Sequence, residues 1–469
     1  MGKILSGYLF PHPPIIIEEI GRGEENRAKE TVYGSKELAK DIKDNKPTTI
    51  IIITPHGPLF RDAISISTEK ILKGDFSNFG NRSLSFSFKN DLELVNNIID
   101  RSYTQDIPIA KIDDDFAKDY DISLKLDHGA LVPLYFVDKE YKNFKLIHIT
   151  YGLLPPKDLF RFGNIIQSAV LESEEDVVLI ASGDLSHKLS DEGPYSYSPY
   201  GEKFDKEIVK LLEEGDFKSI VTFDLNLSER AGECGLRSLM VLSGFLDGHK
   251  IESKVLSYEG PFGVGYSNAK FLVLEKDNNK SIYEDIIDVE KDRIEMIRKK
   301  EDEYVKLART SLEYYIKHGK KIDIPEGLSE ELIKDRYGVF VTLKKDGLLR
   351  GCIGTIEPTQ KSLADEIIKN AISAGLEDPR FDPVTEEELS QLVYSVDVLK
   401  PAESISSIDE LDVERYGVIV SKGTRRGLLL PNLEGVDTPE EQVRIALNKA
   451  GIGEYEDYGL ERFEVIRHF

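Results

Sequence analysis

Three histidines of this chain stand where an apolar run ends, and imidazole is a common metal ligand. His12 closes the run at 7–10, His56 follows four isoleucines at 50–53, and His187 closes the segment that begins with the run at 177–181. Continuous Val, Ile and Leu runs bounded by Pro and Gly are typical of strands buried on both faces, as in parallel sheets. In such sheets ligands bind outside the carboxyl ends of the strands. The pattern predicts a metal site for iron, zinc or copper at that edge.

The residues around these histidines indicate rigid placement. His12 lies in FPHPP, His56 in TPHGP, and a further histidine, His128, begins HGALVPL. Proline fixes φ and removes a backbone donor, so these flanks hold a side chain at a turn, as a metal ligand requires. By contrast, His148 lies inside LIHIT and is expected to be a structural strand residue, and His249 follows a predicted Asp-Gly turn and is expected to be solvated.

A non-haem iron site of the oxygenase type also needs a carboxylate beside two histidines. The favoured candidate is Glu233 in RAGECGLR, where small neighbours allow a close approach of the backbone. Its rival is Glu259 in SYEGPFGVG, and the thiol of Cys234 is a third possibility because thiolate binds softer metals. Asp184 could orient His187, or it could simply form a turn.

The sequence predicts two domains, of which the first carries these side chains. Up to about residue 275, apolar runs alternate with helical stretches, which predicts an α/β domain with a mainly parallel sheet flanked by helices. Residues 276–290 are polar and are predicted to be a linker, and residues 291–469 to form a smaller α+β domain. The expected strands of the first domain are 7–10, 49–53, 146–150, 177–181 and 270–274, and its expected helices are 25–42, 92–103, 156–172, 200–213 and 229–246. In the second domain we expect helices over 282–316, 362–374 and 439–450, strands at 337–343, 392–399, 417–421 and 462–467, and a glycine-rich turn at 349–354.

Composition excludes several classes of protein. The 469 residues carry a net charge of −24 with 40% hydrophobic residues, which argues against binding to nucleic acid or to an anionic membrane surface. Two cysteines exclude a disulfide framework or a cysteine-rich zinc module and favour a reducing, cytoplasmic location. The sequence contains no apolar stretch of transmembrane length and no signal peptide pattern at its start.

Five motifs in order over residues 1–275 resemble a known family. They are PHPP, PHG, DHGALVPL, SGDLSH and GECG, and they are similar to those of the LigB-like class III extradiol ring-cleaving dioxygenases and the related Memo-like proteins. The resemblance implies that His12, His56 and Glu233 bind ferrous iron, that His187 is the catalytic acid and base, and that His128 contacts substrate or oxygen. Memo-like relatives keep the fold without an established ring-cleaving reaction, and fold alone does not determine function.

The second half resembles the AMMECR-type domain, through LRGCIG at 349–354, AGLEDPRF at 374–381 and YSVDVL at 394–399. We interpret Cys352 as a small core residue rather than a nucleophile. Arg350 is expected either to bind an anion or carboxylate or to cover a turn. The fusion of the two halves is similar to the AmmeMemoRadiSam system, which implies a separate radical SAM partner protein, because this chain lacks the CxxxCxxC cluster motif.

These observations lead to three functional hypotheses. The first is an Fe(II)-dependent extradiol dioxygenase, an oxidoreductase acting on a catechol-type aromatic and fused to an accessory domain. The second is a metal-binding redox or maturation factor that works with the radical SAM partner and does not cleave rings. The third is a zinc-dependent hydrolase that uses a metal-bound hydroxide.

Overall fold

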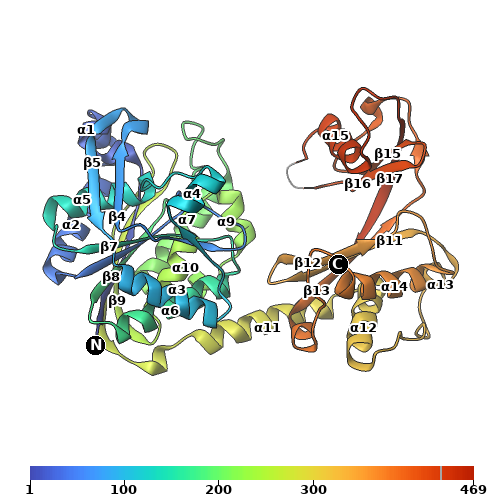
Figure 1. Cartoon of the computed structure of the whole chain (residues 1–469), viewed down its shortest axis with the longest axis horizontal. Helices are drawn as coiled ribbons and strands as arrows, with labels where there is room; N and C mark the ends of the chain where they lie inside the picture. The colour runs from blue at the N-terminus through green and yellow to red at the C-terminus, as the bar shows by residue number, and fades with distance from the viewer. Residues whose placement is uncertain (434–435) are drawn as a thin grey trace. The chain divides into compact units, whose positions relative to one another are not determined.

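The computed structural model describes residues 1–433 and 436–469 and divides the chain into two compact units (Figure 1). The first unit is Met1–Val289 and the second is Glu290–Phe469. The boundary falls inside helix α11 (Tyr283–Lys299), so part of the segment expected as a linker is helical. Among the described residues, no helix is both long and apolar enough to cross a membrane.

The first unit is built on a mixed sheet whose described strands follow the order β6-β3-β7-β2-β8-β1-β10-β9. The four central strands, β7, β2, β8 and β1, are mutually parallel, whereas β10 and β9 add antiparallel pairs at one side and β3 pairs antiparallel with β7 at the other. The strand bounds are β1 (Lys3–Phe10), β2 (Thr49–Thr54), β3 (Ile64–Ser67), β6 (Ile109–Ile112), β7 (Lys145–Thr150), β8 (Asp176–Ser182), β9 (His249–Glu259) and β10 (Tyr266–Lys276), and a separate hairpin pairs β4 (Ile71–Phe76) with β5 (Asn81–Lys89). This confirms the predicted α/β architecture.

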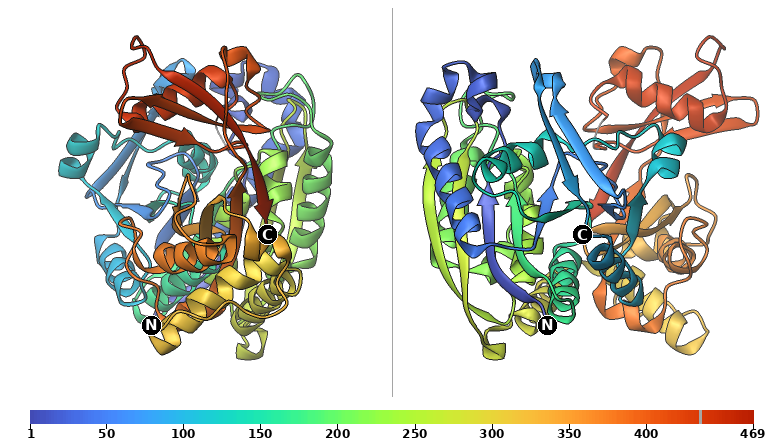
Figure 2. Two further views of the ribbon diagram at one scale, coloured as in Figure 1. Left: turned by 90° about the vertical axis from the view of Figure 1, so that its right-hand side faces the viewer. Right: turned by 60° about the vertical axis from the view of Figure 1, so that its left-hand side comes forward.

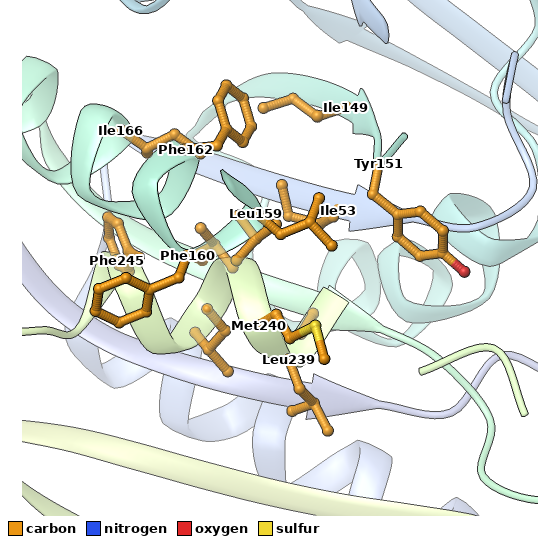
Figure 3. Packing of buried hydrophobic residues seen from close by; sticks show 14 of the residues in the cluster. Ile53, Ile149, Tyr151, Leu159, Phe160, Phe162, Ile166, Leu239, Met240 and Phe245 are labelled. Atoms are coloured by element: carbon orange, nitrogen blue, oxygen red, sulfur yellow. The ribbon is translucent and has the colours of Figure 1, made fainter. Parts of the chain in front are cut away.

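The isoleucine run of β2 shows why both faces of the sheet are covered. Ile51 and Ile53 join one buried apolar cluster and Ile50 and Ile52 join another, because successive strand side chains point to opposite faces. Helices α3, α6, α7 and α10 contribute to the first cluster, and α2 and α5 contribute to the second (Figures 1 and 2). Figure 3 shows α6 and α10 residues such as Phe160 and Met240 packed beneath Ile53. Full burial of one such side chain stabilises the fold by about 1.5–3 kcal/mol.

The five helices predicted in the first unit are present, one of them with a break, and the structure adds four helices that were not predicted, α1, α4, α5 and α8. The helix expected over 229–246 is two helices, because Gly232 adopts a left-handed conformation with φ of 65° and ends the first of them. The bounds are α1 (Glu18–Gly21), α2 (Lys29–Asn45), α3 (Leu92–Thr104), α4 (Asp114–Tyr120), α5 (His128–Glu140), α6 (Pro156–Glu172), α7 (Pro199–Glu214), α8 (Phe217–Val221), α9 (Leu225–Ala231) and α10 (Leu236–Phe245).

The second unit is α+β, as predicted. Its described strands form the path β12-β11-β13-β17-β15-β16, with β14 pairing to β17. One core packs α12 and α14 on the β11–β13 end, and a smaller core packs α15 on β15 and β16. The bounds are α12 (Glu303–His318), α13 (Glu330–Lys334), α14 (Leu363–Leu376), α15 (Pro439–Ala450), β11 (Gly338–Lys345), β12 (Leu348–Gly354), β13 (Leu392–Leu399), β14 (Glu403–Ser404), β15 (Tyr416–Lys422), β16 (Arg425–Leu429) and β17 (Gly459–His468).

One element of this unit differs from the expectation. The glycine-rich segment 349–354 forms strand β12 and not a turn. A Cβ atom on Gly351 would lie 2.1 Å from the carbonyl oxygen of Ala374 in α14. Glycine is therefore present because a helix approaches the strand closely, and not because the chain reverses direction.

Candidate metal centre

The predicted histidines gather at the carboxyl edge of the central strands. The neighbouring strands β2, β8 and β1 end at Thr54, Ser182 and Phe10, and His56, His187 and His12 follow them in the connecting segments. His128 is the first residue of α5. His12, His56 and His128 each offer a ligand atom, and these atoms lie within 4.8 Å of one another. His128, which was expected beside the substrate, thus joins the two expected ligands.

The hydrogen bonds of Ser182 define the tautomer of His12. The Ser182 hydroxyl donates its proton to the carbonyl oxygen of Gly129. Its oxygen, 2.9 Å from His12 Nδ1, therefore accepts the Nδ1 proton. Nε2 of His12 is therefore the unprotonated nitrogen, and a metal-binding imidazole is commonly held by its other nitrogen in this way.

Donor atoms converge on this lone pair. His56 Nε2 lies 3.0 Å from His12 Nε2, Cys234 Sγ lies 3.5 Å away, and Asp184 Oδ2 lies 3.8 Å away. Ligand atoms about 2.0–2.3 Å from a tetrahedral metal are themselves roughly 3.3–3.8 Å apart. The donor set therefore fits a bound divalent cation.

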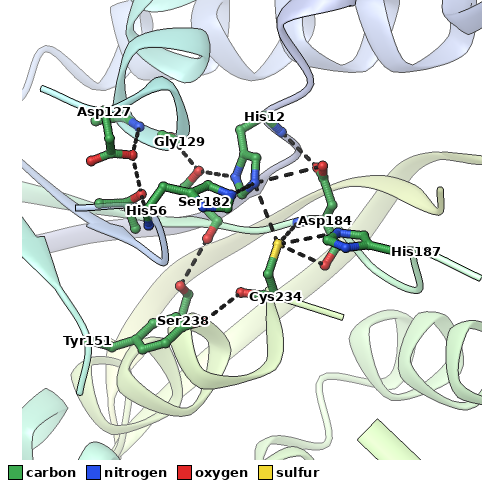
Figure 4. Close-up of polar contacts among 12 residues, drawn as sticks. His12, His56, Asp127, Gly129, Tyr151, Ser182, Asp184, His187, Cys234 and Ser238 are labelled. Atoms are coloured by element: carbon green, nitrogen blue, oxygen red, sulfur yellow. Dashed lines mark hydrogen bonds and ion pairs between the residues drawn. The ribbon is translucent and has the colours of Figure 1, made fainter. Parts of the chain in front are cut away.

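Cys234, and not Glu233, turns towards His12. One carboxylate oxygen of Glu233 accepts from Ser228 Oγ at 2.6 Å and the other accepts from the backbone N–H of Leu236 at 2.7 Å, so Glu233 holds the start of α10. The thiol lies within 3.7 Å of His187 Nε2 as well as near His12, and Figure 4 shows the sulfur between the two rings. The rival candidate Glu259 is engaged elsewhere. One of its carboxylate oxygens accepts hydrogen bonds from the backbone N–H and the hydroxyl of Thr31.

A close crossing of two loops produces this orientation. A Cβ atom on Gly183 would lie 2.1 Å from Cα of Gly235, so only glycine allows the segment after β8 to pass the segment before α10. The N–H of Asp184 is then 3.4 Å from Cys234 Sγ, and the N–H of Cys234 donates to the Asp184 carbonyl at 3.3 Å. The glycines of SGDLSH and GECG therefore bring a thiol to the centre.

Asp184 has a different role from the one suggested. Its Oδ1 accepts from the backbone N–H of His12 at 2.9 Å, so it holds the His12 segment and not the His187 ring. Burial raises the pKa of Asp184 to about 7. His187 instead stacks on Tyr195, with ring centroids 6.0 Å apart and nearly parallel planes.

Burial keeps the imidazoles of the centre neutral. Burial, and then the neighbouring histidines, lower the pKa of His12 well below its usual value. The pKa values of His56 and His187 fall to about 4, again chiefly through burial, and that of His128 is lowered for the same reason. Neutral imidazole is the form that binds metal. Burial also raises the pKa of the Cys234 thiol, so a cation would be needed to hold the thiolate.

A buried carboxylate supports the His56 and His128 segments. Asp127 caps α5 through the N–H of Ala130, accepts from Thr54 Oγ1 at 2.7 Å, and lies 2.9 Å from His148 Nε2. The other ring nitrogen of His148, Nδ1, is hydrogen-bonded to Ser67 Oγ at 3.0 Å. Because both ring nitrogens have protein partners, His148 is structural, as expected from its place inside β7. His249, expected in a solvated turn, instead begins β9 and is buried.

Two aromatic side chains beside the centre were missed by the sequence reasoning. Phe79, in a short 3₁₀ turn between β4 and β5, places its ring 5.4 Å from that of His128 and is 39% exposed. Tyr195, on His187, is 56% exposed. Their exposed rings lie against the rings of His128 and His187, and the YSY pattern at 195–197 was a signal available in the sequence.

The candidates of the second unit have structural partners. Arg350 pairs with Glu388 through two hydrogen bonds of 3.0 and 2.9 Å, so it binds a carboxylate of its own domain. Cys352 is partly buried, and its sulfur accepts from Thr342 Oγ1 at 3.3 Å. Burial raises the pKa of this thiol, which disfavours a reactive thiolate.

Comparisons with known proteins agree with the two units. Protein CA_C1420 of Clostridium acetobutylicum is 48% identical over 462 residues, 98% of each chain. A Thermotoga maritima protein is 55% identical over 170 residues, which is 36% of this chain and 98% of the relative. The solved structure of protein PH0010 from Pyrococcus horikoshii is 38% identical and covers 35% of this chain and 88% of its own, with a TM-score of 0.33. Residues 305–468 match the AMMECR1 family. Residues 6–269 match the catalytic LigB subunit of aromatic ring-opening dioxygenase, and the chain belongs to that family.

Proposed function

We propose that the first unit binds a divalent metal, preferentially ferrous iron, and acts as an extradiol ring-cleaving dioxygenase on a catechol-type aromatic. The observation that carries the proposal is the group of neutral imidazoles, with ligand atoms within 4.8 Å, at the carboxyl edge of the parallel strands. When bound, the metal would hold a catechol and O₂ next to each other and spread charge between them. His12 and His56 would hold it, with Cys234, Asp184 and His128 as further donors nearby.

The remaining side chains suit a planar phenolic substrate. His187 is neutral at pH 7, so it can take a proton from a catechol hydroxyl and return it later. Phe79 and Tyr195 offer exposed rings from two different loops beside His128 and His187. Aromatic rings pack favourably in offset or edge-to-face arrangements, which a catechol ring can adopt against them.

Anaerobic reconstitution tests this proposal. The chain is loaded with Fe(II), its metal content is measured, and catechols and O₂ are added. We expect oxygen uptake and a yellow ring-fission product. His187→Ala should abolish turnover and keep the iron, whereas the matched variant His249→Ala, in the same unit but bonded to the Asp247 carbonyl, should keep both. Retained turnover in His187→Ala would exclude the acid and base role.

A second function is favoured by the thiol. The thiol of Cys234 lies 3.5 Å from His12 Nε2, nearer than the carboxylate oxygen of Asp184 at 3.8 Å, and thiolate suits softer metals and redox chemistry better than the carboxylate of a 2-His-1-carboxylate iron site does. In this alternative the unit is a metal-binding redox or maturation factor without ring cleavage, working with a separate radical SAM protein and with the AMMECR1 domain as an accessory.

Matched substitutions of the two neighbouring residues separate the alternatives. Cobalt(II) is titrated into wild type, Cys234→Ser and Glu233→Gln. If the thiol is a ligand, wild type and Glu233→Gln show a sulfur-to-cobalt charge-transfer band and Cys234→Ser does not. If the carboxylate is the ligand, only Glu233→Gln binds more weakly. Elemental analysis of gently purified protein then identifies iron, zinc or copper.

A further inference from the structure

Arg237 is the one residue of α10 that is not buried, and it lies in the first turn of that helix. Leu236 and residues 238–245 are all buried, whereas Arg237 is partly exposed. Its Nε atom is shielded from solvent and has no acceptor. Among the described residues, Arg237 has neither a hydrogen-bond partner nor an ion pair. Charged groups that are partly buried are normally paired, so this guanidinium indicates a partner supplied by a ligand.

Helix stability does not account for the unpaired cation. The Nε atom of Arg298 in the second unit also lacks an acceptor, but its Nη2 donates to two backbone carbonyls and pairs with Glu313. Burial raises the pKa of Glu233 and Arg237 is among the groups that partly lower it, so these two charges lie near each other without an ion pair. Both carboxylate oxygens of Glu233 are already bonded to other groups. A cation in the first turn of a helix also opposes the helix dipole.

Helix α10 begins at the histidine centre, as Figure 4 shows for Cys234 and Ser238. Cys234, three residues before Arg237, places its sulfur 3.5 Å from His12 Nε2. The residue after Arg237 is Ser238, whose hydroxyl donates to the carbonyl oxygen of Ser182 at 2.9 Å. Ser182 in turn holds the His12 ring. Side chains on a helix lean towards its N-terminus, so the guanidinium extends towards the carboxyl edge where the histidines lie.

We propose that the Arg237 guanidinium binds a carboxylate substituent of the ligand at the histidine centre, and so selects catechols that carry an acid group. The inference rests on the proposed function, which supplies the catechol. A guanidinium presents a planar fork of N–H donors that matches the two oxygens of a carboxylate. The lowered pKa values of His12, His56 and His187 keep these imidazoles neutral, so they provide no counter-ion for an added carboxylate.

Catechols that differ in charge test the contact on the Fe(II)-loaded chain under anaerobic conditions. Bound 4-nitrocatechol is followed by its absorption band and displaced by 4-methylcatechol or by a catechol with a carboxylate, either protocatechuate or homoprotocatechuate. We expect wild type to prefer a carboxylate-bearing catechol. Arg237→Gln should reduce that preference about tenfold, the effect of one hydrogen bond between charged groups, with unchanged iron content and unchanged affinity for 4-methylcatechol. An equal preference in wild type and Arg237→Gln would overturn the proposal.

Two further variants show whether the contact is specific. Arg230→Gln is the matched control, because it removes a cation of the same unit whose guanidinium bonds the Tyr200 hydroxyl. It should keep the preference of wild type, and an equal loss in both glutamine variants would reduce the effect to general charge and overturn the contact. Arg237→Lys keeps the charge without the planar fork, so its preference should be intermediate.

A stability measurement separates the contact from a structural role. Arg237→Met keeps the length of the side chain and removes the unpaired charge. The first unit of this variant should therefore unfold at the same temperature as the unliganded wild type or higher. A lower midpoint would show that the guanidinium holds the fold and would overturn the proposal.

Failure of the proposed function can be recognised separately. If the iron-loaded wild type binds no catechol, the catechol assignment fails, and benzoate is titrated into the Co(II)-loaded chain instead. If the wild type takes up no metal, the same titration is made with the metal-free chain. In either case weaker benzoate binding by Arg237→Gln supports the carboxylate site, and equal or absent binding overturns it.

Discussion

Replacing Asp127 by alanine tests whether the centre depends on one buried carboxylate. The substitution removes the cap of α5, the acceptor of Thr54 Oγ1, and the partner of His148 Nε2. A lost cap costs about 1 kcal/mol, and each buried polar group left without a partner costs about 1–3 kcal/mol. With one cap and two such groups, we expect the free energy of opening of the first unit to fall by about 3–7 kcal/mol at pH 7.

Asp113→Ala is the matched control. Asp113 caps α4 through the N–H of Phe116 at 2.9 Å in the same way, without side-chain partners comparable to those of Asp127. Asp113→Ala should lower the free energy of opening only by the contribution of the helix cap, about 1 kcal/mol. Hydrogen exchange followed by mass spectrometry measures the opening free energy in peptides of α5 and β2, so that unfolding of the second unit does not enter. Equal losses in the two variants would refute the reasoning.

The contribution of Asp127 to stability should depend on pH. Burial by itself would raise the pKa of Asp127, but the hydrogen bonds from His148 and Thr54 outweigh it and lower the pKa to about 2. A carboxyl group whose pKa is lower in the folded state stabilises the fold above its unfolded pKa of about 3.9, and this contribution is lost as the pH falls through the folded value. The difference in stability between wild type and Asp127→Ala should therefore be constant above about pH 5 and shrink towards pH 2.

Three further substitutions have expected outcomes. Burial raises the pKa of Asp205 to about 7, so the stability of the first unit should decline by up to about 4 kcal/mol between pH 4 and 7, and Asp205→Asn should flatten that decline in urea titrations. Gly183→Ala places a Cβ atom 2.1 Å from Gly235, so it should separate the two loops and reduce metal content, and unchanged metal content would contradict the loop crossing. Glu366→Ala removes the acceptor of four hydrogen bonds, two of them from Thr359, and should destabilise the second unit by about 3 kcal/mol or more, as exchange in α14 peptides would report.

Much of the fold and part of the centre follow from local sequence. Apolar runs such as 50–53 and 177–181 predicted the central strands, because a strand buried on both faces needs an apolar residue at every position. Prolines beside His12 and His56 predicted rigid placement at the ends of those strands. The short strands β3 and β6 carried no such run, and the polar hairpin β4–β5 that carries Phe79 has one face in solvent, so neither was predicted.

Only the tertiary structure decided which groups meet. Glu233 and Cys234 are adjacent in the chain, and sequence reasoning favoured the carboxylate, whereas the crossing of Gly183 and Gly235 turns the thiol towards His12 and leaves the carboxylate to hold α10. Strand formation depends on residues next to one another in the chain, but the direction of a loop side chain depends on contacts with segments far away in sequence, which no local pattern records.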